Sequence, residues 1–261
     1  MVAYFADIWR LRHFWLALVR VDLRKRYRRS IIGLGWSLLH PIAMTAVLCV
    51  VFSRLFNLEV RNYAPFLLSG LTFWGFFTAV VMQGCQCFFQ GESYIRQHPA
   101  PLAIYPLRTT LGAGIHFLLG FLIATVFVWL VHGFGNLPAM LSLLPVLVLI
   151  FVFGWSLAVC VGLANVMFQD SQHLLEVALQ MLFYMTPIMY KPEMLLTRRY
   201  LGWFVHLNPL AAFLELFRTP LLEGRLPSYW AFALAAVATC VVAALAALAL
   251  KRFEKRMIFY L

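Results

Sequence analysis

The sequence predicts an all-α, polytopic membrane protein with six transmembrane helices, an N-terminal interfacial amphipathic helix, and short re-entrant or outer helices between spans 5 and 6. Three observations lead to this fold class. Of the 261 residues, 63% are hydrophobic and 12% are charged, whereas a soluble domain carries about 25% charged residues. Charge-free windows long enough to cross a membrane recur along the chain, and lysine and arginine concentrate in the segments that would share one side of it.

The six spans follow from the charge-free windows. A helix needs about 20 mostly apolar residues to cross the hydrocarbon core. Five windows have this length: 30–53, 63–91, 109–131, 139–168 and 226–250. A sixth span is predicted over 171–190, although Glu176 lies within it. The spans are therefore placed at about 33–53, 63–90, 108–131, 139–168, 171–190 and 227–250, in a transmembrane domain of residues 30–261.

An apolar patch at 200–214 is shorter than a span and is interrupted by Asn208-Pro209. Because proline breaks a helix interior, this patch is interpreted as re-entrant or interfacial. Six spans place both termini on one side. With that side inside the cell, the inner segments hold 14 lysines and arginines and the outer loops hold 7, so the positive-inside rule predicts that both termini are cytoplasmic.

Residues 1–29 form a separate segment that combines an amphipathic helix with a basic cluster. Its apolar residues recur at helical spacing, which is typical of a helix lying in the membrane interface. The basic cluster consists of Arg24, Lys25, Arg26, Arg28 and Arg29. Anionic membrane lipids are the expected partner of this cluster. Nucleic acid is the less favoured partner, because no soluble element is present to read a groove.

The sequence contains few groups with catalytic or metal-binding patterns. Its five cysteines lie in apolar runs without metal-ligand spacing, so packing is favoured over a disulfide or metal site. No phosphate-binding loop occurs, so no ATP hydrolysis is expected from this chain alone. Asp170, His173 and Glu176 would share one helix face. They are interpreted as a proton or metal site or, preferably, as a helix start capped by Asp170 at the membrane boundary.

Aromatic side chains are the remaining candidates for a binding site. Trp36 and His40 lie one turn apart on the first predicted span, and Phe183, Tyr184 and Tyr190 lie on or near the fifth. Sugar rings stack their apolar faces on aromatic planes, which favours a carbohydrate path. The alternative is that most of these rings belong to interfacial belts or helix packing.

Several motifs together resemble a known family. Arg26-Tyr27, followed by Ser30-Ile-Ile-Gly-Leu-Gly-Trp-Ser-Leu-Leu-His-Pro41, resembles the entry to the first span of ABC-2 type permeases that export bacterial polysaccharides. Residues 93–106 resemble the family's cytoplasmic coupling segment. The further matching motifs are Leu68-Ser-Gly-Leu-Thr-Phe-Trp-Gly-Phe-Phe77, Phe168-Gln-Asp170, Thr186-Pro-Ile-Met-Tyr190 and Leu207-Asn-Pro209. The chain departs from the family pattern at His40, where relatives often have tryptophan, and at Gln169, where arginine is usual.

The resemblance implies a multi-pass protein of the bacterial inner membrane that works as a homodimer with two copies of a separate ABC ATPase. ATP and Mg would bind that partner, and no cofactor is expected in this chain. The expected cargo is a lipid-linked O-antigen, capsule or teichoic-acid-like polysaccharide. Spans 1 and 5 would line its path through Trp36, His40, Phe183, Tyr184 and Tyr190. The segment 191–225 would form short outer helices that gate the exit.

Two further roles follow from the same resemblance. The N-terminal helix and the segment 93–106 would receive the ATPase, with Tyr94, Ile95, Arg96 and Pro99 as coupling residues. Arg28 and Arg29 would recruit the pyrophosphate head group of the cargo, or alternatively would only anchor and orient the chain. Two other functions stay open: an ABC-2 permease for drugs or small lipids, and a membrane-embedded transferase that uses His173 with Asp170 or Glu176.

Overall fold

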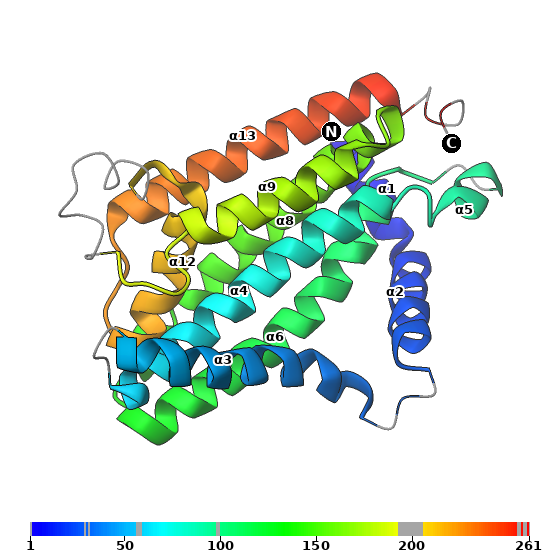
Figure 1. Cartoon of the computed structure of the whole chain (residues 1–261). Helices are drawn as coiled ribbons and strands as arrows, with labels where there is room; N and C mark the ends of the chain where they lie inside the picture. Colours follow the sequence, from blue (N-terminus) through cyan, green and yellow to red (C-terminus); the bar gives the residue numbers. More distant parts are fainter. Residues whose placement is uncertain are drawn as a thin grey trace.

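A computed structural model of the chain describes residues 2–28, 30, 32–55, 59–97, 100–192, 206–254, 257 and 260. Every regular element in these ranges is a helix, and no strand occurs among them. The long helices lie side by side in one bundle, and α2 projects from one end of it (Figure 1). The all-α prediction is confirmed.

Five helices in the described ranges are long and apolar enough to cross a membrane. They confirm the five charge-free windows. Their bounds are α3 Trp36–Leu55, α4 Val60–Gln86, α6 Ile104–His132, α8 Leu143–Met167 (preceded by the short α7, Leu137–Met140) and α13 Tyr229–Phe253. The protein is thus a polytopic membrane protein.

Helix α9, Ser171–Met185, stands where the sixth span is predicted. It has 15 residues, which at 1.5 Å per residue gives about 22 Å and falls short of a hydrocarbon core of about 30 Å. Thr186 and Pro187 end it five residues before the predicted limit. Helix α9 runs beside α4 in the bundle (Figure 1). The six-span count stays a prediction.

Helix α4 is the centre of the bundle and packs against α3, α6, α8 and α9. Its contact with α8 depends on glycine. A Cβ added at Gly84 would lie 2.9 Å from the Cα of Ala158, and one added at Gly162 would lie 2.7 Å from the carbonyl oxygen of Gly84. Real Cβ atoms do not approach so closely, so these two helices pack backbone to backbone.

The N-terminal segment is helical as predicted, and it consists of two helices, α1 (Val2–Arg10) and α2 (Arg12–Tyr27), with a break at Leu11. The indole of Trp15 explains the break. Its Nε1 donates a hydrogen bond of 3.1 Å to the carbonyl oxygen of Ile8, the acceptor that the backbone N–H of Arg12 would use in a continuous helix.

Short helices occupy the two ends of the bundle. Helix α5, Glu92–Gln97, lies near α1 and α2, and α12, Pro209–Arg218, lies at the opposite end and continues as the π-helix η2, Thr219–Glu223. Asn208 caps α12, because its side chain accepts a hydrogen bond from the N–H of Leu210 at 2.9 Å. Pro209 is the first helical residue, a position where its missing N–H costs nothing. The predicted short helices after α9 are confirmed in this part, whereas residues 193–205 lie outside the described residues.

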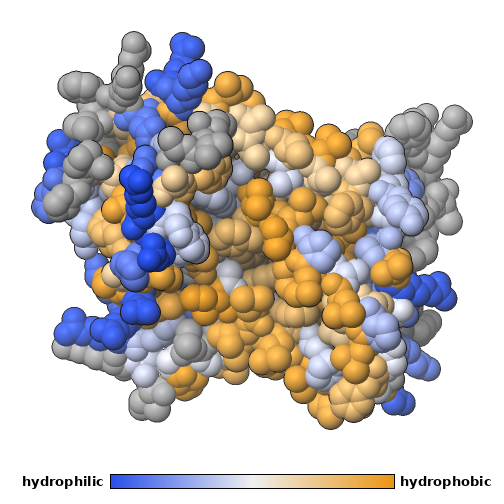
Figure 2. Space-filling model, turned by 180° about the vertical axis from the view of Figure 1, so that it is seen from behind, coloured by the Kyte–Doolittle hydropathy of each residue, from blue (hydrophilic) through white to orange (hydrophobic). Residues whose placement is uncertain are grey.

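The two ends of the bundle differ in polarity. Figure 2 shows an apolar band across the middle of the molecule, with the most hydrophilic residues gathered at the end that carries α2. The exposed side chains of Arg24, Lys25, Arg26 and Arg28 lie there. We call this the basic end, and the end that carries α12 the opposite end.

Candidate functional site

A cavity of about 440 Å³ lies between α3, α4 and α6. Arg26 and Tyr27, at the end of α2, form its rim at the basic end. Aromatic rings and small polar groups form its walls. These groups include Trp36, His40, Thr72, Trp74, His116 and Phe183. One side of the cavity therefore offers cationic and polar groups, and its interior offers mainly ring faces.

A tight turn places Trp36 at this rim. The side chain of Ser30 accepts a hydrogen bond from the N–H of Gly33 at 3.0 Å. Gly33 has a φ of +56°, which lies in the left-handed region that favours glycine. Gly33 begins the 3₁₀ turn Gly33–Gly35, which leads directly into α3, so that Trp36 is the first residue of α3. Across the rim, the Tyr27 hydroxyl lies 3.3 Å from each ring nitrogen of His116.

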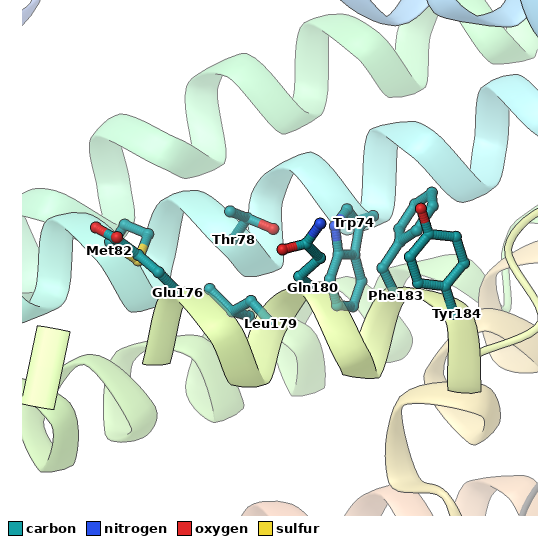
Figure 3. Close-up of a pocket in the computed structure, with 8 residues that line it drawn as sticks. All are labelled: Trp74, Thr78, Met82, Glu176, Leu179, Gln180, Phe183 and Tyr184. Atoms are coloured by element: carbon teal, nitrogen blue, oxygen red, sulfur yellow. The ribbon is translucent and has the colours of Figure 1, made fainter. Parts of the chain in front are cut away.

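A groove of about 370 Å³ runs between α4 and α9 (Figure 3). Its lining residues come from one face of each helix: Trp74, Thr78 and Met82 of α4, and Glu176, Leu179, Gln180, Phe183 and Tyr184 of α9. Trp74 and Phe183 line both the groove and the cavity, and their ring centres lie 5.5 Å apart. The two spaces therefore meet at this pair.

At the opposite end, Arg218 of α12 is buried and joins three segments. Its guanidinium donates hydrogen bonds to the carbonyl oxygens of Phe66, Pro187 and Ile188 at 3.0, 2.6 and 2.8 Å. Its Nε also donates to the Ser69 hydroxyl at 3.4 Å. Five N–H donors in a planar fork suit such a set of acceptors. Arg218 thus holds α12 against α4 and against the turn that follows α9.

A family model described as ABC-2 type transporter matches residues 13–222, which is most of the chain. The chain belongs to the ABC-2 type transporter family. Among curated proteins, it is 26% identical over 216 residues to an O-antigen export system permease protein RfbA of Klebsiella pneumoniae, with 81% of each chain covered. It is 25% identical over 229 residues to the RfbA protein of Myxococcus xanthus, with 87% of each chain covered.

The structure brings together four of the five aromatic-path residues predicted for this ABC-2 chain. Trp36 and His40 line the cavity, Phe183 lines both spaces, and Tyr184 lines the groove. Tyr190 lines neither of these two spaces. Its hydroxyl donates a hydrogen bond of 3.0 Å to the carbonyl oxygen of Tyr184. Whether any of these residues contacts a substrate stays a prediction.

Sequence reasoning missed Trp74 as a site residue, although it recognised the motif that contains it. The spacing of Trp74, Thr78 and Met82 is four residues, which places them on one face of α4. That signal was available in the sequence. What the sequence did not give is the identity of the facing helix, because α4 has several neighbours in the bundle.

The acidic residues at the start of α9 follow the preferred interpretation in part. Helix α9 begins directly after Asp170, but the Asp170 side chain makes no capping hydrogen bond, so that detail is wrong. His173 Nδ1 lies 3.6 Å from a carboxylate oxygen of Glu176. Within the part of the chain that the structure describes, no group of three His, Cys, Asp or Glu side chains could hold a metal ion.

The predicted coupling residues of this ABC-2 chain differ in exposure. Ile95 is buried, and Tyr94 packs edge-on against Phe14 of α2 with ring centres 5.9 Å apart. Arg96 is exposed and pairs with Glu92 at 2.8 Å within α5. Pro99 lies outside the described residues. Their contact with an ATPase stays a prediction, for which Arg96 offers the accessible side chain.

The segment after α5 is tied to both ends of the chain. The Tyr4 hydroxyl donates a hydrogen bond of 2.9 Å to the Glu254 carboxylate. The N–H of Leu102 donates to the same carboxylate oxygen at 3.2 Å, and the N–H of Ala103 donates to the Tyr4 hydroxyl at 3.3 Å. Burial raises the pKa of Tyr4, and the nearby Glu254 carboxylate adds to this effect, so the hydroxyl keeps its proton and donates.

The predicted head-group residues lie beside the cavity rim. Arg28 is exposed at the C-cap of α2. It lines a shallow hollow with Arg24, Lys25 and Tyr27. Arg29 lies outside the described residues. Arg26 lines the cavity itself, a role that composition alone did not separate from that of its basic neighbours.

Proposed function

We propose that this chain is the membrane-spanning permease subunit of an ABC transporter that exports a lipid-linked polysaccharide across the bacterial inner membrane. A separate ATPase subunit would hydrolyse ATP. The observation that carries the proposal is that the cavity and the groove share Trp74 and Phe183 in their linings. Together, these two spaces would form the path. The family match and the names of the curated relatives, which are O-antigen export permeases, support it.

The lining of this path suits a sugar polymer in transit. Aromatic faces stack on sugar rings, and such contacts tolerate a change of ring as the chain moves. A conducting site must bind strongly enough to admit its cargo and weakly enough to release it. Ring faces with few charged groups satisfy both conditions. Arg26 at the rim supplies a cation for the phosphate end of a lipid carrier.

The arrangement of partners follows from the two ends of the bundle. The basic end would face the cytoplasm, because positive charge is retained on that side. The exposed residues of α5 would then meet the ATPase. Two copies of the chain would pair with two ATPase subunits. In α3 and in α13, only 17% of the residues in the most apolar stretch are buried within one chain. These helices therefore leave apolar faces for a second copy or for lipid.

Deletion of the chain in its host tests the proposal. We expect loss of surface polysaccharide and accumulation of the lipid-linked polymer in the inner membrane. The chain should also co-purify with a subunit that carries a phosphate-binding loop. Unchanged surface polysaccharide with increased sensitivity to a hydrophobic drug would instead assign this permease to drug export.

A further inference from the structure

We infer that the groove between α4 and α9 recognises the hydroxyl groups of an uncharged glycan, with Glu176 and Gln180 as its hydrogen-bonding groups, and disfavours polymers that carry repeating negative charges. This inference rests on the proposed function and narrows its substrate class. It concerns Glu176 and Gln180, two polar residues of the groove that are not among the aromatic residues predicted to contact the polymer.

The groove presents two facing rows of side chains (Figure 3). Glu176, Gln180 and Tyr184 follow one another at intervals of four residues along α9, which corresponds to about 6 Å per step. Across from them, Thr78 lies one turn from Trp74 on α4. Figure 3 shows Glu176, Thr78 and Gln180 toward one end of the groove and the rings of Trp74, Phe183 and Tyr184 toward the other. The groove thus offers hydrogen-bonding groups next to ring faces, which suits the hydroxyl edges and apolar faces of sugars.

The polar groups keep capacity for a ligand. One oxygen of Glu176 accepts a hydrogen bond of 3.3 Å from Gln172, and the other lies 3.6 Å from His173 Nδ1. A carboxylate offers about four acceptor positions, so capacity for further donors remains. Gln172 itself accepts a hydrogen bond from Gln86 of α4, which braces this end of the groove. Gln180 is exposed on the same side of α9, so its amide is accessible from the groove.

The charges along the path favour an uncharged cargo. Among the described residues that line the groove and the cavity, Glu176 is the only acidic one and Arg26 the only lysine or arginine. Arg26 belongs to the rim, so no arginine or lysine of this lining stands beside Glu176, and its nearest basic neighbour is His173 on the same helix, 3.6 Å away and outside the lining. A uronic acid or phosphodiester repeat would pass this exposed carboxylate, and like charges at close range repel. Sugar hydroxyls would instead donate hydrogen bonds to it.

Binding of two labelled oligosaccharides tests the inference on the full chain in lipid nanodiscs. The probes are maltoheptaose, which is uncharged, and heptagalacturonic acid, which is anionic, each followed by fluorescence anisotropy. We expect the wild type to bind maltoheptaose about tenfold more tightly or better, because like-charge contacts penalise the anionic chain. Glu176→Gln should retain maltoheptaose binding and raise the affinity for heptagalacturonic acid severalfold.

Asp170→Asn is the matched control, because Asp170 is an exposed carboxylate next to the same helix and does not line the groove. It should leave both affinities unchanged. Equal affinity of the wild type for both probes, or an unchanged preference in Glu176→Gln, would overturn the inference while export of a polysaccharide still stood. If neither probe binds, the groove is not a glycan site, and the deletion experiment judges the proposed function separately.

Discussion

The guanidinium carbon of Arg218 lies 3.7 Å from the centre of the Phe66 ring. A buried cation is costly unless its donors are satisfied. Here the ring face and three backbone carbonyl groups surround it. The arrangement makes Arg218 the point at which α12, α4 and the turn after α9 are held together.

Replacing Arg218 with alanine should destabilise the protein by about 3 kcal/mol, because the carbonyl acceptors lose a charged donor and a cavity remains. Lysine should not restore stability, since a single ammonium cannot reach the same acceptors as the planar fork. Gly70→Ala should act through the same group, because an added Cβ would collide with the guanidinium. Thermal unfolding in detergent measures all three. A Gly70→Ala/Arg218→Ala variant whose loss equals the sum of the single losses would contradict the shared cause.

The ion pair between Asp22 of α2 and Arg108 of α6 should fix the position of the N-terminal helices. Arg108 is buried and binds both carboxylate oxygens of Asp22. Asp22→Ala should cost about 2 to 3 kcal/mol, since it leaves a buried arginine unpaired. It should also expose the connection between α2 and α3 to added protease. Asp7→Asn is the control, because its contact with Arg10 is a solvent-exposed pair at 3.9 Å and contributes little.

Aromatic contacts along the path should control transport rather than assembly. Trp36→Ala/Tyr184→Ala should reduce export severalfold while the variant still assembles with its ATPase, because each aromatic stacking contact contributes about 1 kcal/mol. Polymer on the cell surface measures the effect. Trp230→Ala is the control, since Trp230 is exposed on α13 and lines neither the cavity nor the groove. Full export by the double variant would rule out these residues as contacts.

The rim of the cavity permits a comparison within the basic cluster. Arg26→Gln should lower export more than Arg28→Gln, because Arg26 lines the cavity whereas Arg28 faces the hollow beside it. The paired variant Arg28→Gln/Arg29→Gln tests the head-group role predicted from the sequence. Topology should survive in each case, since several basic residues remain. Equal export by wild type and all variants would show that the basic cluster only anchors the chain at the membrane.

Cysteine labelling checks the orientation of the basic end. Arg96→Cys should react with a membrane-impermeant maleimide only after the inner face is opened, and should crosslink to the ATPase. Ile95→Cys provides the neighbouring control, because that side chain is buried and should react slowly from either side. Labelling of Arg96→Cys in intact cells would reverse the predicted topology.

The long helices were predictable because hydropathy is a local property of the chain. The ends of these helices were less predictable where tertiary contacts determine them. Helix α6 begins at Ile104, four residues before the predicted limit of 108. Arg108 was excluded from the apolar window as a charge, yet inside the fold Asp22 neutralises it. Asp22 lies 86 residues away from Arg108 in the sequence, so a hydropathy average over neighbouring residues cannot detect the pairing.

The site was predictable in its chemistry and not in its assembly. Trp36, His40, Phe183 and Tyr184 stand out as aromatic or ionisable groups on apolar spans. That Trp74 and Phe183 meet depends on which helices are neighbours. Arg218 was counted among the loop charges, because nothing in the local sequence distinguishes it from a solvated arginine. Its acceptors come from segments about 30 and 150 residues earlier in the chain.

The bond between Tyr4 and Glu254 has a consequence for biosynthesis. The two residues are 250 positions apart, and a ribosome adds about 5–20 residues per second. Helix α1 therefore waits on the order of 10 to 50 seconds after its own synthesis before its partner exists. During that interval the Tyr4 hydroxyl lacks its Glu254 acceptor. Phe5 and Trp9, which stay exposed in the finished fold, present an apolar surface throughout. We therefore expect the N-terminal helix of the nascent chain to bind the membrane surface before α13 has been inserted.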